Sequence, residues 1–280
     1  MLCPMSTAPR RAPLSFDGRP AGLLLAGPQA APLALFLAPY PLPAGCWEPL
    51  LEACAEAGLR AAAVDAPGFG ETPARGAPLL MDDLARLALA AADSLAASHV
   101  HLVGCSMGGY AAMAFARLFP ERLASLCLLN TKAAPDTAEQ RAGREKGAAL
   151  ALAQGAAAVT GPLLPKLVAH GLPARDPALF ARVGRLAQSA SAQGVHDALL
   201  GMAARADAAQ WLGTCRAPTL VVAGEHDQVI ALAEVEALAR LVPGARLEVV
   251  AGAGHYAFLE RPAAVQALLL DFLRAQTTQG

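Results

Sequence analysis

The sequence predicts an α/β fold: a mostly parallel sheet with helices on both faces and a helical segment inserted between two of its strands. Stretches with the pattern of strands alternate with stretches with the pattern of helices, which is typical of a parallel sheet covered on both sides. This alternation pauses over residues 131–213, where only alanine-rich helical stretches broken by glycine and proline occur. With 280 residues, of which 55% are apolar and 16% charged, the chain can bury a large core.

The first half of the chain begins with an expected loose tail over residues 1–11. A short hairpin is then predicted from residues 14–16 and 22–26, because an Asp-Gly pair lies between them. The first long helix is expected to end at Gly58. Further strands are predicted at residues 33–37, 60–64, 100–103 and 124–129, and helices at residues 47–57, 82–97 and 110–118.

After the pause, the alternation resumes. Strands are predicted at residues 219–223 and 246–250, and helices at residues 231–241 and 263–275. The chain is thereby divided into a core of residues 1–130 and 214–280 and a helical lid of residues 131–213. Because the lid is inserted at the carboxyl end of a strand, where α/β folds bind their ligands, we expect it to cover the functional site.

Composition excludes several classes of partner. The 22 basic and 23 acidic residues balance without long runs of either sign, which argues against nucleic acid or an anionic membrane as the main partner. The apolar stretch at residues 23–38 is interrupted by Gly27, Pro28 and Pro32, so it does not predict a membrane span. Six scattered cysteines without a CxxC pair indicate buried thiols in a reducing compartment. We expect a cytoplasmic protein with a small-molecule substrate and no metal or cofactor; the oligomeric state stays open.

Residues 104–109, Gly-Cys-Ser-Met-Gly-Gly, form the most informative motif of the chain. They lie between a predicted strand and a predicted helix, where glycines two residues before and after a serine are typical of a nucleophile elbow. The elbow forces Ser106 into a strained backbone that raises its hydroxyl above the sheet edge. Side chains at positions 104 and 108 would collide with the neighbouring helix and strand, so these positions favour glycine.

A serine nucleophile needs a base, and the base needs an acid that holds its tautomer. Of the six histidines, His255 is the best candidate, because it lies in a glycine-rich loop after a strand and before the last helix. Asp227 is the best candidate for the acid, because it follows the strand at residues 219–223, and Glu225 is the second choice. At the end of the strand after the elbow, another place for an acid, the chain has Asn130, which cannot serve.

The tetrahedral intermediate of acyl transfer requires hydrogen-bond donors for its oxyanion. One is expected from the backbone N–H of Met107, at the positive end of the helix that follows the elbow. The second is expected from the loop at residues 38–42, where Pro39 and Pro41 have no N–H. Tyr40 is therefore our choice, ahead of Leu42. Such donors each stabilise the transition state by about 3 kcal/mol.

Residues 65–70, Asp-Ala-Pro-Gly-Phe-Gly, lack the GK[ST] ending of a phosphate-binding loop, so we interpret them as a structural turn in which Asp65 bonds backbone groups. The motifs that match a known family are the elbow, residues 65–70, Gly-Glu-His-Asp at 224–227, and Gly-His at 254–255 followed by Phe-Leu-Glu-Arg-Pro at 258–262. Over residues 14–275 the chain resembles the α/β-hydrolase superfamily. The likeness is greatest to small bacterial esterases, enol-lactonases and cofactor-free haloperoxidase-like members.

This resemblance implies hydrolysis of carboxylic esters or lactones through an acyl-enzyme at Ser106. One departure concerns the oxyanion loop, where relatives usually carry His-Gly and this chain has Ala38-Pro39. Because no basic cluster is evident at the mouth of the site, the expected substrates are small to medium-sized and mostly neutral. Apolar pocket walls are expected from Tyr256 and from members of a set of lid residues, although most of this set is expected to form the core of the lid itself: Leu163, Leu164, Leu167, Val168, Phe180, Val183 and Leu199.

Other activities are compatible with the same three residues. A lactone hydrolase, a C–C bond hydrolase, an acyltransferase and a perhydrolase differ from an esterase in pocket shape and water access, which the sequence does not distinguish. An alternative hypothesis from another functional class is a non-catalytic protein with the same fold that only binds a ligand. Such a protein is expected to lack one of the three residues, but Ser106, Asp227 and His255 are all present.

Overall fold

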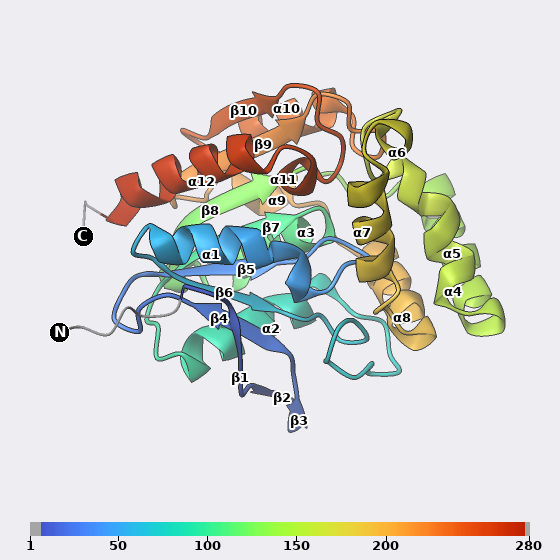
Figure 1. The fold of residues 1–280 in the computed structure, drawn as a ribbon, viewed down its shortest axis with the longest axis horizontal. Coiled ribbons are helices and arrows are strands. Elements are labelled where there is room, and N and C mark those ends of the chain that lie inside the picture. The colour runs from blue at the N-terminus through green and yellow to red at the C-terminus, as the bar shows by residue number, and fades with distance from the viewer. Residues whose placement is uncertain (1–6, 278–280) are drawn as a thin grey trace.

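The structure is a computed structural model and describes residues 7–277. Among these residues, eight strands form one sheet in the order β1-β4-β6-β5-β7-β8-β9-β10 (Figure 1). The pairs from β6 to β10 are parallel, whereas β4 and β1 are antiparallel to their neighbours. The strands of this sheet are β1 (Arg10–Ala12), β4 (Leu23–Ala26), β5 (Leu33–Leu37), β6 (Arg60–Val64), β7 (Val100–Cys105), β8 (Leu123–Leu129), β9 (Thr219–Gly224) and β10 (Arg246–Val250).

The predicted α/β fold class is confirmed, and helices cover both faces of the sheet. In Figure 1, α1 and α12 lie side by side over one face. Along β5, Ala34 and Phe36 belong to the cluster on that face, and Leu33, Leu35 and Leu37 to the cluster with α2 and α3 on the other. This alternation follows from the two-residue period of a strand. The covering helices are α1 (Glu48–Glu56), α2 (Met81–Ser94), α3 (Met107–Leu118), α10 (Leu232–Leu241) and α12 (Pro262–Thr277).

The N-terminal region differs from the prediction. Residues 10 and 11, expected in the loose tail, form β1 together with residue 12, and β1 pairs with β4; residues 1–6 of that tail lie outside the described residues. The hairpin consists of β2 (Ser15–Phe16) and β3 (Arg19–Pro20), joined by Asp17 and Gly18, both with positive φ. Because these two residues alone make the turn, the strands of the hairpin flank it directly. The fully buried β4 pairs within the main sheet instead.

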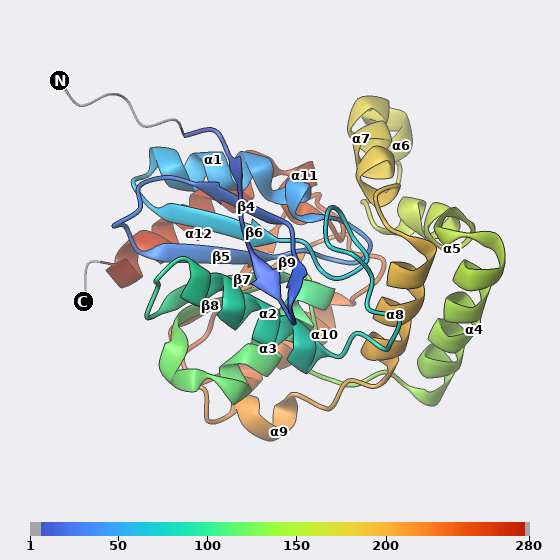
Figure 2. The ribbon, with the colours of Figure 1, turned by 90° about the horizontal axis from the view of Figure 1, so that it is seen from below.

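The chain between β8 and β9 forms helices and no strand within the described residues. In Figure 2, the helices from α4 to α8 stand beyond the carboxyl ends of the parallel strands, whereas α9 lies next to α3. Trp211 of α9 donates its indole N–H to the Met113 carbonyl of α3 at 3.0 Å. We call residues 131–213 the inserted segment; its helices are α4 (Ala138–Gln154), α5 (Ala156–Leu163), α6 (Leu172–Arg175), α7 (Pro177–Ala187), α8 (Ala192–Ala203) and α9 (Ala209–Leu212).

Short helices complete the structure: η1 (Ala44–Trp47), η2 (Pro120–Arg122), η3 (Leu164–Lys166) and α11 (Ala257–Glu260). No helix within residues 7–277 has both the length and the apolar character needed to cross a membrane.

The turn after β6 is organised by Asp65. Its carboxylate accepts hydrogen bonds from the backbone N–H groups of Ala44 at 2.6 Å and Glu71 at 3.0 Å, as expected for a structural turn.

Candidate active site

Ser106 lies at the sharp turn between β7 and α3. Its φ of 52° and ψ of −114° belong to a strained region that non-glycine residues rarely adopt. A Cβ at Gly104 would overlap the backbone of Gly108, and a Cβ at Gly108 would overlap the Leu37 carbonyl of β5. The glycines therefore allow α3 to pack against the sheet closely enough for the turn to form. Thr131 donates its hydroxyl to the Ser106 carbonyl at 3.0 Å and so supports this backbone.

Asp227 and His255 meet at the same edge of the sheet. The His255 Nδ1 and the Asp227 Oδ2 are 2.8 Å apart, and both side chains are only 1% exposed. The other carboxylate oxygen of Asp227 accepts the backbone N–H groups of Val229 at 2.8 Å and Ile230 at 3.0 Å. These bonds orient the carboxylate toward the imidazole ring. Glu225, the second choice for the acid, instead accepts the backbone N–H of Gly252 at 2.8 Å.

The surroundings of Asp227 favour its ionised form. Burial alone would raise the pKa of this carboxyl. The charge of His255 and the hydrogen bonds from His255, Asn130 and Ile230 outweigh burial and lower the pKa below its ordinary value. A carboxylate that stays ionised can hold the imidazole in one tautomer and stabilise its protonated form.

Asn130 is a residue of the candidate site that sequence reasoning missed. Its Nδ2 donates to the Asp227 Oδ2 at 3.0 Å and to the Gly254 carbonyl at 3.2 Å, and its side chain is fully buried. Its φ of 46° lies in the left-handed region, which asparagine tolerates better than most residues. The sequence alone indicates position 130 only as a place for the acid. The Asn130 amide is instead a hydrogen-bond donor to the acid, and the signal for this in the sequence was the position of Asn130 at the end of a strand.

The two expected oxyanion donors belong to residues close to Ser106, since Met107 follows it in the chain and Tyr40 lines the same cavity. Met107 is the first residue of α3, where an N–H has no partner within the helix. In the loop after β5, Leu42 donates its N–H to the Pro39 carbonyl at 2.7 Å and is thereby engaged. Tyr256 donates its hydroxyl to the Tyr40 carbonyl at 2.9 Å and so fixes the residue expected to be the second donor.

A cavity of about 290 Å³ adjoins Ser106 and is lined by His255 and Tyr40 as well. Of the predicted wall residues, Leu163, Leu167 and Leu199 line it. Tyr256 does not, because it is fully buried with its hydroxyl bonded to Tyr40. Phe180 does not line it either, and neither do the remaining predicted residues Leu164, Val168 and Val183; all four pack in or against the core cluster that contains α1 and α12.

The same cavity is lined by charged side chains that we had not expected: Lys132, Asp136 and Arg144. The premise that no basic cluster adjoins the site is therefore wrong. Gln140 and Arg144 lie four and eight residues after Asp136, a spacing that places them on one face of a helix. This periodicity was visible in the sequence, but which face of the helix meets the cavity depends on tertiary packing.

The remaining histidines and acids do not form a second centre. His101 is buried against the Ser125 hydroxyl at 2.8 Å, and His196 contacts Asp197 at 2.9 Å. Within residues 7–277, no group of three or more His, Cys, Asp or Glu side chains is placed to hold a metal ion.

Comparisons with known proteins agree with this geometry. A family model described as alpha/beta hydrolase fold matches residues 40–262. The chain is 29% identical over 236 residues to a poly(3-hydroxyalkanoate) depolymerase from Ectopseudomonas oleovorans, covering 81% of this chain and 79% of that protein. A malate-bound thermophilic esterase from Thermogutta terrifontis matches with a TM-score of 0.88 at 28% identity, covering 96% and 99% of the two chains. The enol-lactonase from Burkholderia xenovorans LB400 matches with a TM-score of 0.85 at 25% identity, covering 95% and 100%.

Proposed function

Because the chain belongs to the α/β-hydrolase fold family, we propose that it is a serine hydrolase that cleaves carboxylic esters through an acyl-enzyme at Ser106. The observation that supports this most directly is the buried contact of 2.8 Å between His255 and Asp227, with His255 lining the same cavity as Ser106. A nucleophile, a base and an orienting acid in one cavity are the groups that acyl transfer requires.

The reaction begins when the Ser106 hydroxyl attacks the ester carbonyl and His255 accepts its proton. Asp227, bonded to Nδ1, directs the other ring nitrogen of His255 to the nucleophile. The N–H groups of Tyr40 and Met107 stabilise the oxyanion. His255 then protonates the leaving alcohol, and a water molecule activated by His255 releases the acid and restores Ser106.

The substrate is a small to medium-sized ester, in keeping with a cavity of about 290 Å³ whose walls include Leu163, Leu167 and Leu199. The names of the similar proteins, a polyester depolymerase, an esterase and an enol-lactonase, all describe cleavage of an ester linkage. The likeness to the enol-lactonase favours a lactone as the second candidate. In both cases the inserted segment acts as a lid, because its side chains supply those apolar walls.

The proposal is tested with p-nitrophenyl esters of increasing acyl length. We expect Ser106→Ala to lower kcat by about 10⁴- to 10⁶-fold. The control is Ser94→Ala at the end of α2, whose hydroxyl bonds only the Ala91 carbonyl in the described structure; it should keep wild-type activity. A serine-reactive phosphonate should label wild type and not Ser106→Ala. Activity that survives in folded Ser106→Ala would contradict the assignment.

A further inference from the structure

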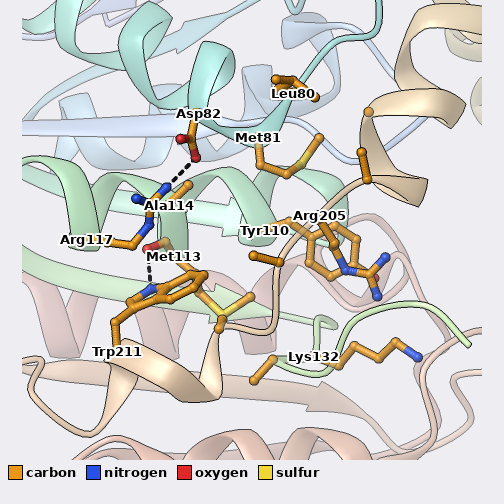
Figure 3. A pocket seen from close by; sticks show the side chains of 15 residues that line it. Leu80, Met81, Asp82, Tyr110, Met113, Ala114, Arg117, Lys132, Arg205 and Trp211 are labelled. Carbon is orange, nitrogen blue, oxygen red and sulfur yellow. Dashed lines mark hydrogen bonds and ion pairs between the residues drawn. The ribbon is translucent and has the colours of Figure 1, made fainter.

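One end of the active-site cavity is built around Tyr110, in the first turn of α3. Tyr110 and Lys132 line both this cavity and a smaller adjoining one, which is drawn in Figure 3. The Arg205 guanidinium lies 4.2 Å from the centre of the Tyr110 ring. In Figure 3, Arg205 and Lys132 extend past Tyr110 in the same direction. We call the group of Tyr40, Tyr110, Lys132, Asp136, Arg144 and Arg205 the polar end of the cavity.

Positive charge is in excess at the polar end. Asp136, whose side chain is 1% exposed, forms ion pairs with both Arg144 and Arg205, the latter at 2.7 Å. Lys132 pairs with Glu234 at 2.8 Å. Three cations therefore share two carboxylates, which leaves a net charge of +1 among these five side chains.

Hydrogen-bond donors are also in excess there. Besides its bonds to Asp136, Arg144 places Nη1 3.4 Å from the Met202 sulfur, a weak acceptor. The Lys132 ammonium has three protons, and Glu234 is its single acceptor within residues 7–277. The buried Tyr40 hydroxyl has no hydrogen-bond partner in the described structure. Buried polar groups are normally satisfied, so the Tyr40 hydroxyl and the Lys132 ammonium, whose side chain is 6% exposed, indicate an acceptor that arrives with a ligand. The Arg144 side chain is 24% exposed and is accessible to the same acceptor.

The cavity has apolar walls in addition to the polar end. The remaining walls carry Val159, Leu163, Leu167 and Leu199, all apolar. A ligand that matches both parts has an apolar body and one anionic end. The Nε and Nη2 of Arg144 donate to Asp136, which leaves Nη1, with no oxygen acceptor in the described structure, to donate to the anionic end of a ligand. Such charge-assisted hydrogen bonds are about twice as strong as neutral ones.

We propose that the substrate carries a free carboxylate in addition to the ester or lactone that is cleaved, and that Arg144 binds this carboxylate together with Lys132 and the Tyr40 hydroxyl. The substrates are then half-esters of short dicarboxylic acids, esters of hydroxy acids, or lactones with a carboxylate substituent. This inference rests on the proposed hydrolysis at Ser106 and adds the charge of the substrate to it.

The test compares esters that differ only in charge. Monomethyl glutarate, with its carboxylate on the acyl side of the ester, is compared with the methyl ester of its monoamide. The acetyl ester of 4-hydroxybutanoate, with its carboxylate on the alcohol side, is compared with that of 4-hydroxybutanamide. We expect kcat/KM to favour the carboxylate about tenfold to hundredfold in one of these pairs.

Variants assign the preference to the polar end. Arg144→Gln and Lys132→Met should each reduce the ratio of the two kcat/KM values toward one, and Arg144→Lys should restore part of it. Lys146→Gln is the matched control, because Lys146 is an exposed cation of the same helix that does not line the cavity. It should keep the wild-type ratio.

The outcomes separate the two proposals. Hydrolysis of charged and neutral esters at equal kcat/KM overturns the carboxylate site and leaves the serine hydrolase intact. If wild type hydrolyses none of these esters, calorimetric binding of monomethyl glutarate and its amide decides the matter. Tighter binding of the carboxylate that is lost in Arg144→Gln supports the site, and equal binding overturns it.

Discussion

Asn130 and Asp227 are neighbours at the ends of adjacent strands, and the amide of one donates to the carboxylate of the other at 3.0 Å. The same amide reaches the Gly254 carbonyl, one residue before His255. Asn130 thus connects the acid with the loop of the base. It does not line the cavity, so we regard it as a positioning residue for the proposed reaction.

Replacing Asn130 with glycine should lower kcat about tenfold to hundredfold, because a hydrogen bond to a charged group contributes about 1.5–3 kcal/mol. Glycine tolerates the φ of 46° at this position, so the backbone is not strained. KM should change little. Asn130→Asp keeps the shape but places a second carboxylate against Asp227, which should shift the acid limb of the pH–rate profile upward. Wild-type kcat and pH profile in both variants would show that the amide only fills space.

The residues of the candidate site differ in how far the sequence predicted them. Asp227 and His255 were chosen because each follows a strand, and parallel strands end at one edge of the sheet; the structure brings them to 2.8 Å. Arg144 was missed because it is 38 residues from Ser106, and only the packing of α4 brings it to the cavity. Phe180 and Tyr256 were placed in the pocket from hydrophobicity alone, which does not distinguish a cavity wall from a core.

At the scale of elements, α8 is fixed to the core by two close contacts of backbone with backbone. Gly194 of α8 touches Gly68, and Gly201 of α8 touches the Leu79 carbonyl, so that a Cβ at either position would overlap backbone atoms. Between them, Asp197 accepts the Gly76 N–H through its side chain and the Leu79 N–H through its carbonyl, both at 2.9 Å. These contacts position Leu199 and Met202, which line the cavity.

Gly201→Ala should therefore lower the free energy of unfolding by about 1–3 kcal/mol, because a backbone carbonyl cannot move aside as a side chain can. It should also lower kcat/KM by displacing α8. The matched control is Gly184→Ala in α7, where a Cβ would meet only the Leu164 side chain at 3.9 Å. That variant should gain about 0.5–1 kcal/mol from helix propensity. Urea denaturation measures both, and equal stability of the two variants would contradict the close packing of α8.

The strands show where prediction of elements succeeds and fails. Strands β5, β6, β8, β9 and β10 were predicted within one residue of their ends. For β5 and β9 this follows because buried parallel strands are continuous apolar runs, whereas β10 is a partly exposed edge strand. Strand β1 was missed because it is a three-residue edge strand whose burial is partial, so its sequence has no apolar run. Its position depends on pairing with β4, a non-local contact that local pattern does not encode.

At the scale of the whole molecule, residues that follow Asp227 and His255 in the sequence hold the inserted segment next to the candidate active site. Gln228, after Asp227, donates to the Val168 carbonyl at 2.7 Å. The Glu260 carboxylate accepts the Ala169 N–H at 2.8 Å and, through its other oxygen, the Gly254 N–H at 3.1 Å. The wall of the cavity at Leu167 and the loop of His255 therefore share their supports, and a shift of one moves the other.

Asp136 connects the beginning and the end of the inserted segment, because it precedes α4 and pairs with Arg205 after α8. Burial alone would raise the pKa of Asp136, but the hydrogen bonds and charges of Arg144 and Arg205 outweigh it and lower that pKa. A carboxyl whose pKa is lower in the folded than in the unfolded state stabilises the fold above its unfolded pKa of about 3.9. This stabilisation is lost as the pH falls through the lower, folded pKa.

Asp136→Asn should therefore be less stable than wild type at pH 7 by about 3–5 kcal/mol, since Arg205 stays buried without its charged partner. The difference should begin to shrink below about pH 4, where the carboxyl becomes protonated in the unfolded chain, and should be lost as the pH falls through the lower, folded pKa. Urea denaturation followed by circular dichroism between pH 2 and pH 8 measures this dependence. Asp207→Asn, which removes a carboxylate without an ion pair in the described structure, should follow the wild-type curve. An offset between Asp136→Asn and wild type that is constant at every pH would show that Asp136 contributes through packing and not through its charge.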